Sequence, residues 1–114
     1  MSNENWYIAE FVIAVDFDGG EPHEYRIETF VIKAITSEEA YEKSQALLVK
    51  LNGSLDNGFG EIENYVCLGF HNLSEHHDAN NGEIVHINTI DLVDVSGNPP
   101  KPRIRGKNEL YLFL

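Results

Sequence analysis

Histidine and acidic side chains gather in residues 63–92, where chemistry is first expected. Four of the five histidines and the only cysteine lie there. Six side chains have the types that bind zinc or another divalent cation: His71, His76, His77, His86, Glu75 and Asp78. Their spacing matches no metal-binding pattern. We therefore expect no metal ion or other cofactor, and His71 with His86 remains the candidate ligand face if their strands pair.

Cys67 is the candidate nucleophile, and His71 would lie on the same face of a strand. A reactive thiol needs a lowered pKa, which an electropositive environment usually provides. The surrounding sequence is instead strongly negative. This favours a small buried cysteine over a catalytic one.

Paired carboxylates are the remaining chemical motif: Asp16 with Asp18, and Glu61 with Glu63. Such pairs serve acid–base catalysis or calcium binding in other proteins. Here they flank turns, where solvated acids are expected. The sequence contains no glycine-rich phosphate loop and no dinucleotide-binding fingerprint, so we expect a protein that is not an enzyme.

The formal net charge of −11 is large for 114 residues, and it is unevenly distributed. Residues 1–96 carry 4 basic and 18 acidic side chains, a balance of −14, whereas the remainder carries 4 basic and 1 acidic. Such a body would repel a phosphate backbone, since nucleic-acid binding depends on Lys and Arg. The charge predicts a basic protein partner or simply solubility.

A single cysteine forms no intramolecular disulfide, and the polar start followed by a run broken by Glu10 and Asp16 does not resemble a signal peptide. No segment approaches the ~20 apolar residues that a membrane helix needs. We expect a cytoplasmic protein with no membrane partner.

The elements that would position these residues begin with a hairpin. Residues 6–17 alternate, which predicts a strand with both faces fairly apolar. Asp18-Gly19-Gly20 is typical of a turn, and residues 25–34 resume a strand. Thr36-Ser37-Glu38-Glu39 then resembles a capping box, which predicts a helix that ends at Asn52-Gly53.

Residues 53–60 are expected to form a loop. The strands that follow are predicted to be the sheet's central pair, with Val66, Leu68 and Phe70 on one face and a β-bulge near 88–91 in the second strand. The fold class is therefore α+β, with an antiparallel sheet of four or five strands in the order ββαββ and one helix on one face. We assign residues 1–95 to this domain, 96–108 to a proline-rich basic linker, and 109–114 to an apolar strand that could pair within the chain or form a homodimer.

Three short motifs resemble the small bacterial family known as domain of unknown function 4288, over about residues 6–93. They are Trp6-Tyr7-Ile8-Ala9, the Lys33-Ala34-x-x-Ser37-Glu38-Glu39-Ala40 helix entry, and Gly69-Phe70-x-x-Leu73 followed by Gly82-Glu83-Ile84. The resemblance implies a compact α+β domain and carries no catalytic residues to transfer. The proline-rich and basic tail departs from it.

Two functions remain open. The first is a noncatalytic acidic protein-binding module, whose sharpest form is an immunity or antitoxin protein that neutralises a basic toxin. Its candidate partner-binding residues are Glu75, His76, His77, Asp78, Glu83, Asp56, Glu61 and Glu63. The second is a small ligand- or metal-binding domain, or an enzyme, that uses the His71/His86 face with Tyr65 and Glu83 in a concave pocket.

Overall fold

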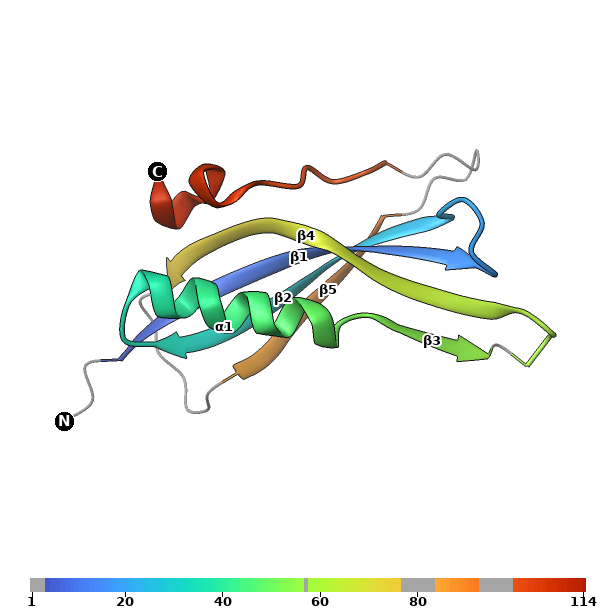
Figure 1. Cartoon of the computed structure of the whole chain (residues 1–114), viewed down its shortest axis with the longest axis horizontal. Helices are drawn as coiled ribbons and strands as arrows, with labels where there is room; N and C mark the ends of the chain where they lie inside the picture. Colours follow the sequence, from blue (N-terminus) through green and yellow to red (C-terminus); the bar gives the residue numbers. More distant parts are fainter. Residues whose placement is uncertain (1–3, 57, 77–83, 93–99) are drawn as a thin grey trace.

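The chain forms a five-stranded antiparallel sheet with one helix on one face (Figure 1). The computed structural model describes residues 4–56, 58–76, 84–92 and 100–114, and for residues 76 and 84–92 it describes the backbone only. The elements are β1 (Asn5–Phe17), β2 (Glu24–Ala34), α1 (Ser37–Lys50), β3 (Gly53–Asp56), β4 (Ile62–His76), β5 (Ile84–Leu92) and the 3₁₀ turns η1 (Lys107–Glu109) and η2 (Tyr111–Phe113). This confirms the predicted α+β class, and the helix and the four long strands follow the predicted ββαββ order, with the short strand β3 added between α1 and β4.

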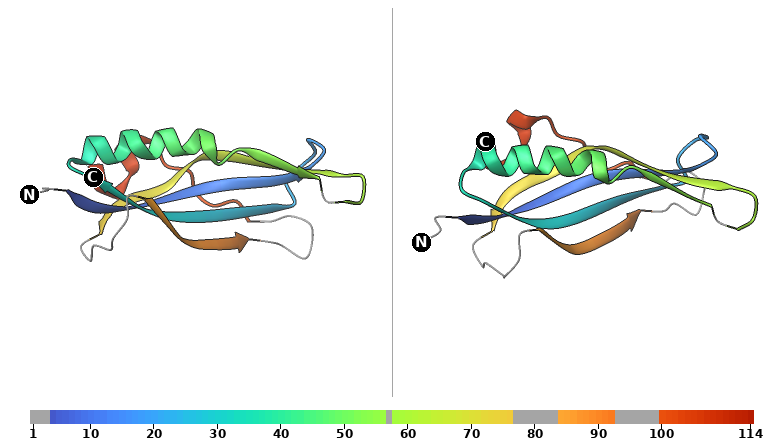
Figure 2. Two further views of the ribbon diagram at one scale, coloured as in Figure 1. Left: turned by 90° about the horizontal axis from the view of Figure 1, so that it is seen from below. Right: turned by 60° about the horizontal axis from the view of Figure 1, so that its bottom comes forward.

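The β1–β2 hairpin lies at the centre of the sheet, whose strand order is β3-β4-β1-β2-β5. Its register runs without interruption from the Asn5–Ala34 pair to the Val15–Glu24 pair. Both faces of β1 are buried, since neither Phe11 on the helix face nor Val12 on the opposite face is exposed. Figure 2 shows that the sheet curls, so that β5 lies below β1 and β2 on the side away from α1.

The helix begins at the predicted cap. The Thr36 hydroxyl accepts a hydrogen bond from the Glu39 amide at 3.1 Å, and the Glu39 carboxylate accepts one from the Ile35 amide at 3.2 Å. These bonds satisfy amide groups that have no partner within the helix. Ala40 is fully buried against the sheet, together with the partly buried leucines 47, 48 and 51.

Two predictions about the sheet are wrong. Residues 53–56 are not a loop but the edge strand β3, which pairs with β4 from Gly53–Tyr65 to Asp56–Ile62. The strands β4 and β5 are not a central pair, because β1 and β2 lie between them. The long β1–β2 hairpin takes the centre, since it offers two buried faces, and β4 and β5 pair with its two outer sides.

Two β-bulges change the side-chain alternation of β4. Its register with β1 passes from Ile13–Cys67 to Val12–Gly69 and from Phe11–Phe70 to Glu10–Asn72, which leaves Leu68 and His71 as extra residues. Phe70 therefore joins Tyr65 and Cys67 on the helix face. The prediction that it shares a face with Val66 and Leu68 is wrong. In β5 the register shift leaves Ile87 unpaired, one residue before the predicted range.

The C-terminal strap, residues 100–114, is bound to the domain. The Arg105 amide donates to the Phe70 carbonyl at 2.8 Å, and the Arg105 guanidinium donates to the His71 carbonyl. Residues 109–114 do not form the predicted strand: they lie in and around the turns η1 and η2, and Leu110 is fully buried in the core. The C-terminal strand through which the homodimer was predicted to form is therefore absent from residues 109–114. Residues 100–108, the described section of the predicted basic linker, lie against the domain and do not extend away from it.

The helix of the described structure is too short and too polar to cross a membrane.

Candidate functional site

Two connections meet at one end of the sheet and form an acidic tip, defined as residues 16–23, 53–56 and 58–63 (Figure 1). The Asp18 amide donates to the Ile62 carbonyl at 2.8 Å, and the Ile62 amide donates to Asp18 Oδ1 at 2.9 Å. These two bonds join the β1–β2 turn to the start of β4. The tip has six acidic residues and no lysine or arginine: Asp16, Asp18, Glu21, Asp56, Glu61 and Glu63.

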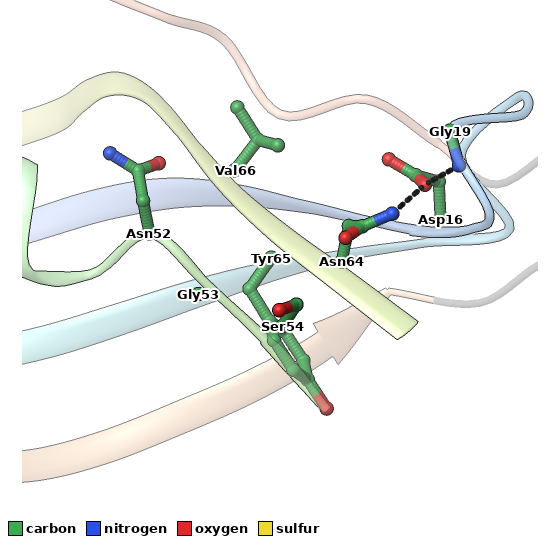
Figure 3. Close-up of a pocket in the computed structure, with 8 residues that line it drawn as sticks. All are labelled: Asp16, Gly19, Asn52, Gly53, Ser54, Asn64, Tyr65 and Val66. Atoms are coloured by element: carbon green, nitrogen blue, oxygen red, sulfur yellow. Dashed lines mark hydrogen bonds between the residues drawn. The ribbon is translucent and has the colours of Figure 1, made fainter. Parts of the chain in front are cut away.

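Hydrogen bonds within the tip fix two of these carboxylates. Asp16 Oδ1 accepts from the Gly19 amide at 2.8 Å and from the Asn64 side chain at 3.0 Å (Figure 3). Asp18 adopts a φ of 54°, a left-handed conformation that Asp tolerates better than most residues. The two acids therefore stabilise the turn, as expected for carboxylates that flank turns.

An open hollow of about 690 Å³ lies beside the tip (Figure 3). Eight residues of β1, β3, β4 and the adjoining turns line it: Asp16, Gly19, Asn52, Gly53, Ser54, Asn64, Tyr65 and Val66. A small-molecule site is usually more enclosed. The hollow instead has the form of a shallow surface depression between β1, β3 and β4.

Ion pairs compensate several of the acids outside the tip. Cations lie within 4.0 Å of five carboxylates outside the tip: Glu4 with Lys33, Glu24 with Arg26, Glu39 with Lys43, Glu38 with Lys107 and Glu109 with Arg103. In the described part of the chain, no ion pair involves Asp16, Asp18, Glu21 or Asp56. These four carboxylates therefore form a group without ion pairs at one end of the described structure.

Tyr65 connects the tip to the helix face of the sheet. Its hydroxyl donates to the Glu63 carboxylate, and the Arg26 guanidinium lies 5.2 Å from the centre of its ring. The hydrogen bond to Glu63 raises the pKa of Tyr65, and burial adds to the rise. The phenol therefore stays protonated at neutral pH and acts as a hydrogen-bond donor.

The structure divides the predicted partner-binding residues. It brings Asp56, Glu61 and Glu63 together at the β3–β4 hairpin. Glu75 lies at the far end of β4, roughly 40 Å along the strand from Glu63 at ~3.3 Å per residue. His76 is described by its backbone alone, and His77, Asp78 and Glu83 lie outside the described residues.

The strand pairing on which the predicted His71/His86 face depends does not form. These residues belong to β4 and β5, which are three strand spacings apart, or ~14 Å at ~4.8 Å per spacing. His71 Nδ1 instead donates to the Arg103 carbonyl at 2.9 Å. Among the described residues, no three His, Cys, Asp or Glu side chains are placed to share a metal ion.

Cys67 has the properties of a structural cysteine. Burial raises the pKa of its thiol to about 11, and the negative charge of Glu28 acts in the same direction. A thiolate is the nucleophilic form of cysteine. The structure therefore agrees with the expectation of an unreactive side chain in the sheet.

The sequence did not predict that the two turns are in contact, because the acids at 16–21 and 56–63 are separated along the chain by β2 and α1. The sequence feature that could have indicated this contact is the absence of Lys and Arg from both turns.

Comparison of the chain with protein-family models, with curated proteins and with solved structures gives no match. The resemblance to domain of unknown function 4288 stays a prediction.

Proposed function

We propose that this protein is a noncatalytic acidic binding module that uses its acidic tip to bind a basic protein partner in the cytoplasm. The observation that supports this most strongly is that no ion pair involves Asp16, Asp18, Glu21 or Asp56 in the described part of the chain, whereas Glu38 and Glu39 of the helix and Glu109 of the strap each pair with Lys or Arg. Unpaired surface charge of one sign accelerates association with a partner of the opposite sign.

The alternative is a small ligand- or metal-binding domain, or an enzyme, that uses the His71/His86 face. It requires these two groups to converge in a pocket. Their strands are separated by β1 and β2, and His71 already binds the strap. Protein binding by the tip is therefore the better supported proposal.

The test is affinity capture from an extract of the source organism with three forms of the full chain. The tip variant carries Asp18→Asn, Glu21→Gln and Asp56→Asn, each of which keeps an oxygen acceptor and removes a charge. The control variant carries Glu10→Gln, Glu42→Gln and Glu75→Gln, which remove the same charge from elsewhere. Wild type and control should recover one strongly basic protein that salt releases, and the tip variant should not.

Recovery of no basic protein, or equal recovery by the two variants, would count against the proposal. Because Glu75 is neutralised only in the control, the comparison also tests whether the far end of β4 takes part in binding.

The narrower form of the proposal is an immunity or antitoxin protein. It predicts that a gene beside this one encodes the basic partner and that the partner alone arrests growth. Co-expression of wild type should restore growth, and co-expression of the tip variant should not. A partner that is harmless when expressed alone would exclude the immunity role and leave protein binding in place.

A further inference from the structure

The face of the sheet opposite α1 carries an apolar stripe beside the acidic tip. It consists of Ile62, Val66 and Leu68 of β4, which are 40%, 42% and 37% exposed. Ala14, on β1, pairs with Val66 and lies buried beside the stripe. Apolar side chains grouped in this way on a sheet are a common feature of interaction surfaces.

Carboxylates flank this stripe on both sides. Asp56 of β3 pairs with Ile62, and Asp16 of β1 pairs with Asn64. Cross-strand partners share a face of the sheet and lie about 5 Å apart. A segment bound along the stripe would therefore have one acid on its β3 side and one on its β1 side.

The strap already occupies the continuation of this surface. Ile104 lies where a side chain at position 69 would extend, since a Cβ built on Gly69 would be 2.9 Å from Ile104 Cγ2. Gly69 pairs with Val12, so Ile104 covers the face opposite α1. The adjacent Arg103 pairs with Glu109, and Arg105 binds the His71 carbonyl. An extended Arg-Ile-Arg segment thus binds β4 immediately beyond the exposed stripe.

The outer edge of β4 is less open than its face. The strand β3 pairs with residues 62–65, Asn52 Oδ1 accepts a hydrogen bond from the Cys67 amide at 2.7 Å, and Arg105 pairs with Phe70. A partner that binds here therefore meets side chains on the face rather than the edge of β4.

We infer that the stripe and its two flanking acids are the docking surface for an extended segment of the partner in which basic and apolar residues alternate. Its apolar side chains contact Val66 and Leu68, and its basic side chains contact Asp16 and Asp56. The inference rests on the proposed function and specifies the surface and the type of segment that it binds. Ile104 of the strap is an intramolecular example of an apolar side chain of an extended segment that lies over β4 next to the stripe.

The test is an NMR titration of the ¹⁵N-labelled full chain with three synthetic octapeptides. One alternates Lys and Val, the second alternates Lys and Ser, and the third alternates Glu and Val. The Lys–Val peptide should give saturable shifts confined to residues 14–18, 54–56 and 62–68. The Lys–Ser peptide should bind at least tenfold more weakly, and the Glu–Val peptide should not bind.

Substitution of the stripe should separate its apolar contribution from charge. Two variants test this: the single substitution Val66→Thr, which nearly conserves the shape of the side chain, and the double substitution Val66→Ser with Leu68→Ser. Each variant should bind the Lys–Val peptide more weakly than wild type and bind the Lys–Ser peptide as weakly as wild type does. Val49→Ser with Leu114→Ser removes apolar groups that are 73% and 84% exposed elsewhere, and it should change neither affinity.

Saturable Lys–Val binding at another surface would overturn the docking surface and leave the acidic module in place. Equal affinities for the Lys–Val and Lys–Ser peptides would do the same, because the stripe would then contribute nothing. Failure of both basic peptides to bind would contradict the docking surface and the proposed function together.

Discussion

Gly69 is the residue that lets the strap lie against β4. Its φ is 146°, a backbone conformation that favours glycine, and it stands between the two bulged residues Leu68 and His71. Any Cβ at this position would also lie 2.9 Å from Ile104. Both the backbone and the contact therefore require glycine.

Gly69→Ala should lower the free energy of unfolding by about 1–3 kcal/mol, since it introduces backbone strain and a clash together. Chemical denaturation measures the loss. Gly53→Ala is the control, because no atom lies within 4 Å of the added Cβ. The addition of Ile104→Ala should recover the part of the loss that comes from the clash. An unfolding free energy of Gly69→Ala equal to that of wild type would contradict this account.

Cys67 should react with a thiol-specific reagent at pH 8 far more slowly in the folded protein than in denaturant. Its folded pKa of about 11 lies above the ordinary value, so the folded state holds the thiol proton over a range in which the unfolded state loses it. Stability should therefore fall as pH rises from the ordinary thiol pKa toward 11, and Cys67→Ala should lack this component. Equal reaction rates in the folded and unfolded states would show that the thiol is not shielded.

At the level of elements, the strap completes the core on the helix side. Leu110 is fully buried, the Tyr111 amide donates to the Asn72 side chain at 3.0 Å, and the Lys107 ammonium lies 2.8 Å from Glu38. Lys107 also lies 4.8 Å from the centre of the Tyr41 ring. The strap thus holds α1 and the outer part of β4 together.

Leu110→Ala should cost about 2–5 kcal/mol, the usual range for removal of a fully buried leucine side chain. Leu114→Ala, at a position that is 84% exposed, should change stability by no more than ~0.5 kcal/mol. Thermal or denaturant unfolding of the two variants measures the difference. Similar stabilities would mean that the strap contributes little to the core.

Local patterns were sufficient to predict some elements but not others. The alternation of residues 6–17, the turn at Asp18 and the cap at Thr36 lie within a few residues of what they determine, and all three predictions are confirmed. The edge strand β3 has no alternation because all four residues are exposed, and the bulges of β4 arise in its pairing with the distant strand β1. The docking of the strap and the assembly of the tip also depend on contacts between residues far apart in the sequence, so local patterns could not predict them.

In the described part of the molecule, cations pair with several acids of the helix and strap but not with Asp16, Asp18, Glu21 or Asp56 of the tip. The ion pairs of the strap and helix involve Lys107 and Lys43, whereas the turns of the tip contain no Lys or Arg. Exposed like charges repel one another more strongly at low salt. The tip therefore reduces the stability of the isolated protein, and a basic partner would relieve that repulsion.

The tip variant should be more stable than wild type at low salt, by up to ~1 kcal/mol, and the difference should shrink as salt is raised. The control variant, with three acids neutralised elsewhere, should gain less. Denaturant unfolding at two salt concentrations checks this. Equal gains in the two variants would show that the repulsion is not concentrated at the tip.

The most direct test of the central claim is calorimetric titration of the Lys–Val octapeptide into wild type, the tip variant and the control variant. Removal of three carboxylates from the tip should weaken binding about tenfold or more at low salt, since charge pairs across an interface contribute to both association rate and affinity. The control should bind as wild type does, and about 0.5 M salt should reduce the difference. Equal affinities of the tip and control variants would contradict the claim that the acidic tip binds the basic partner.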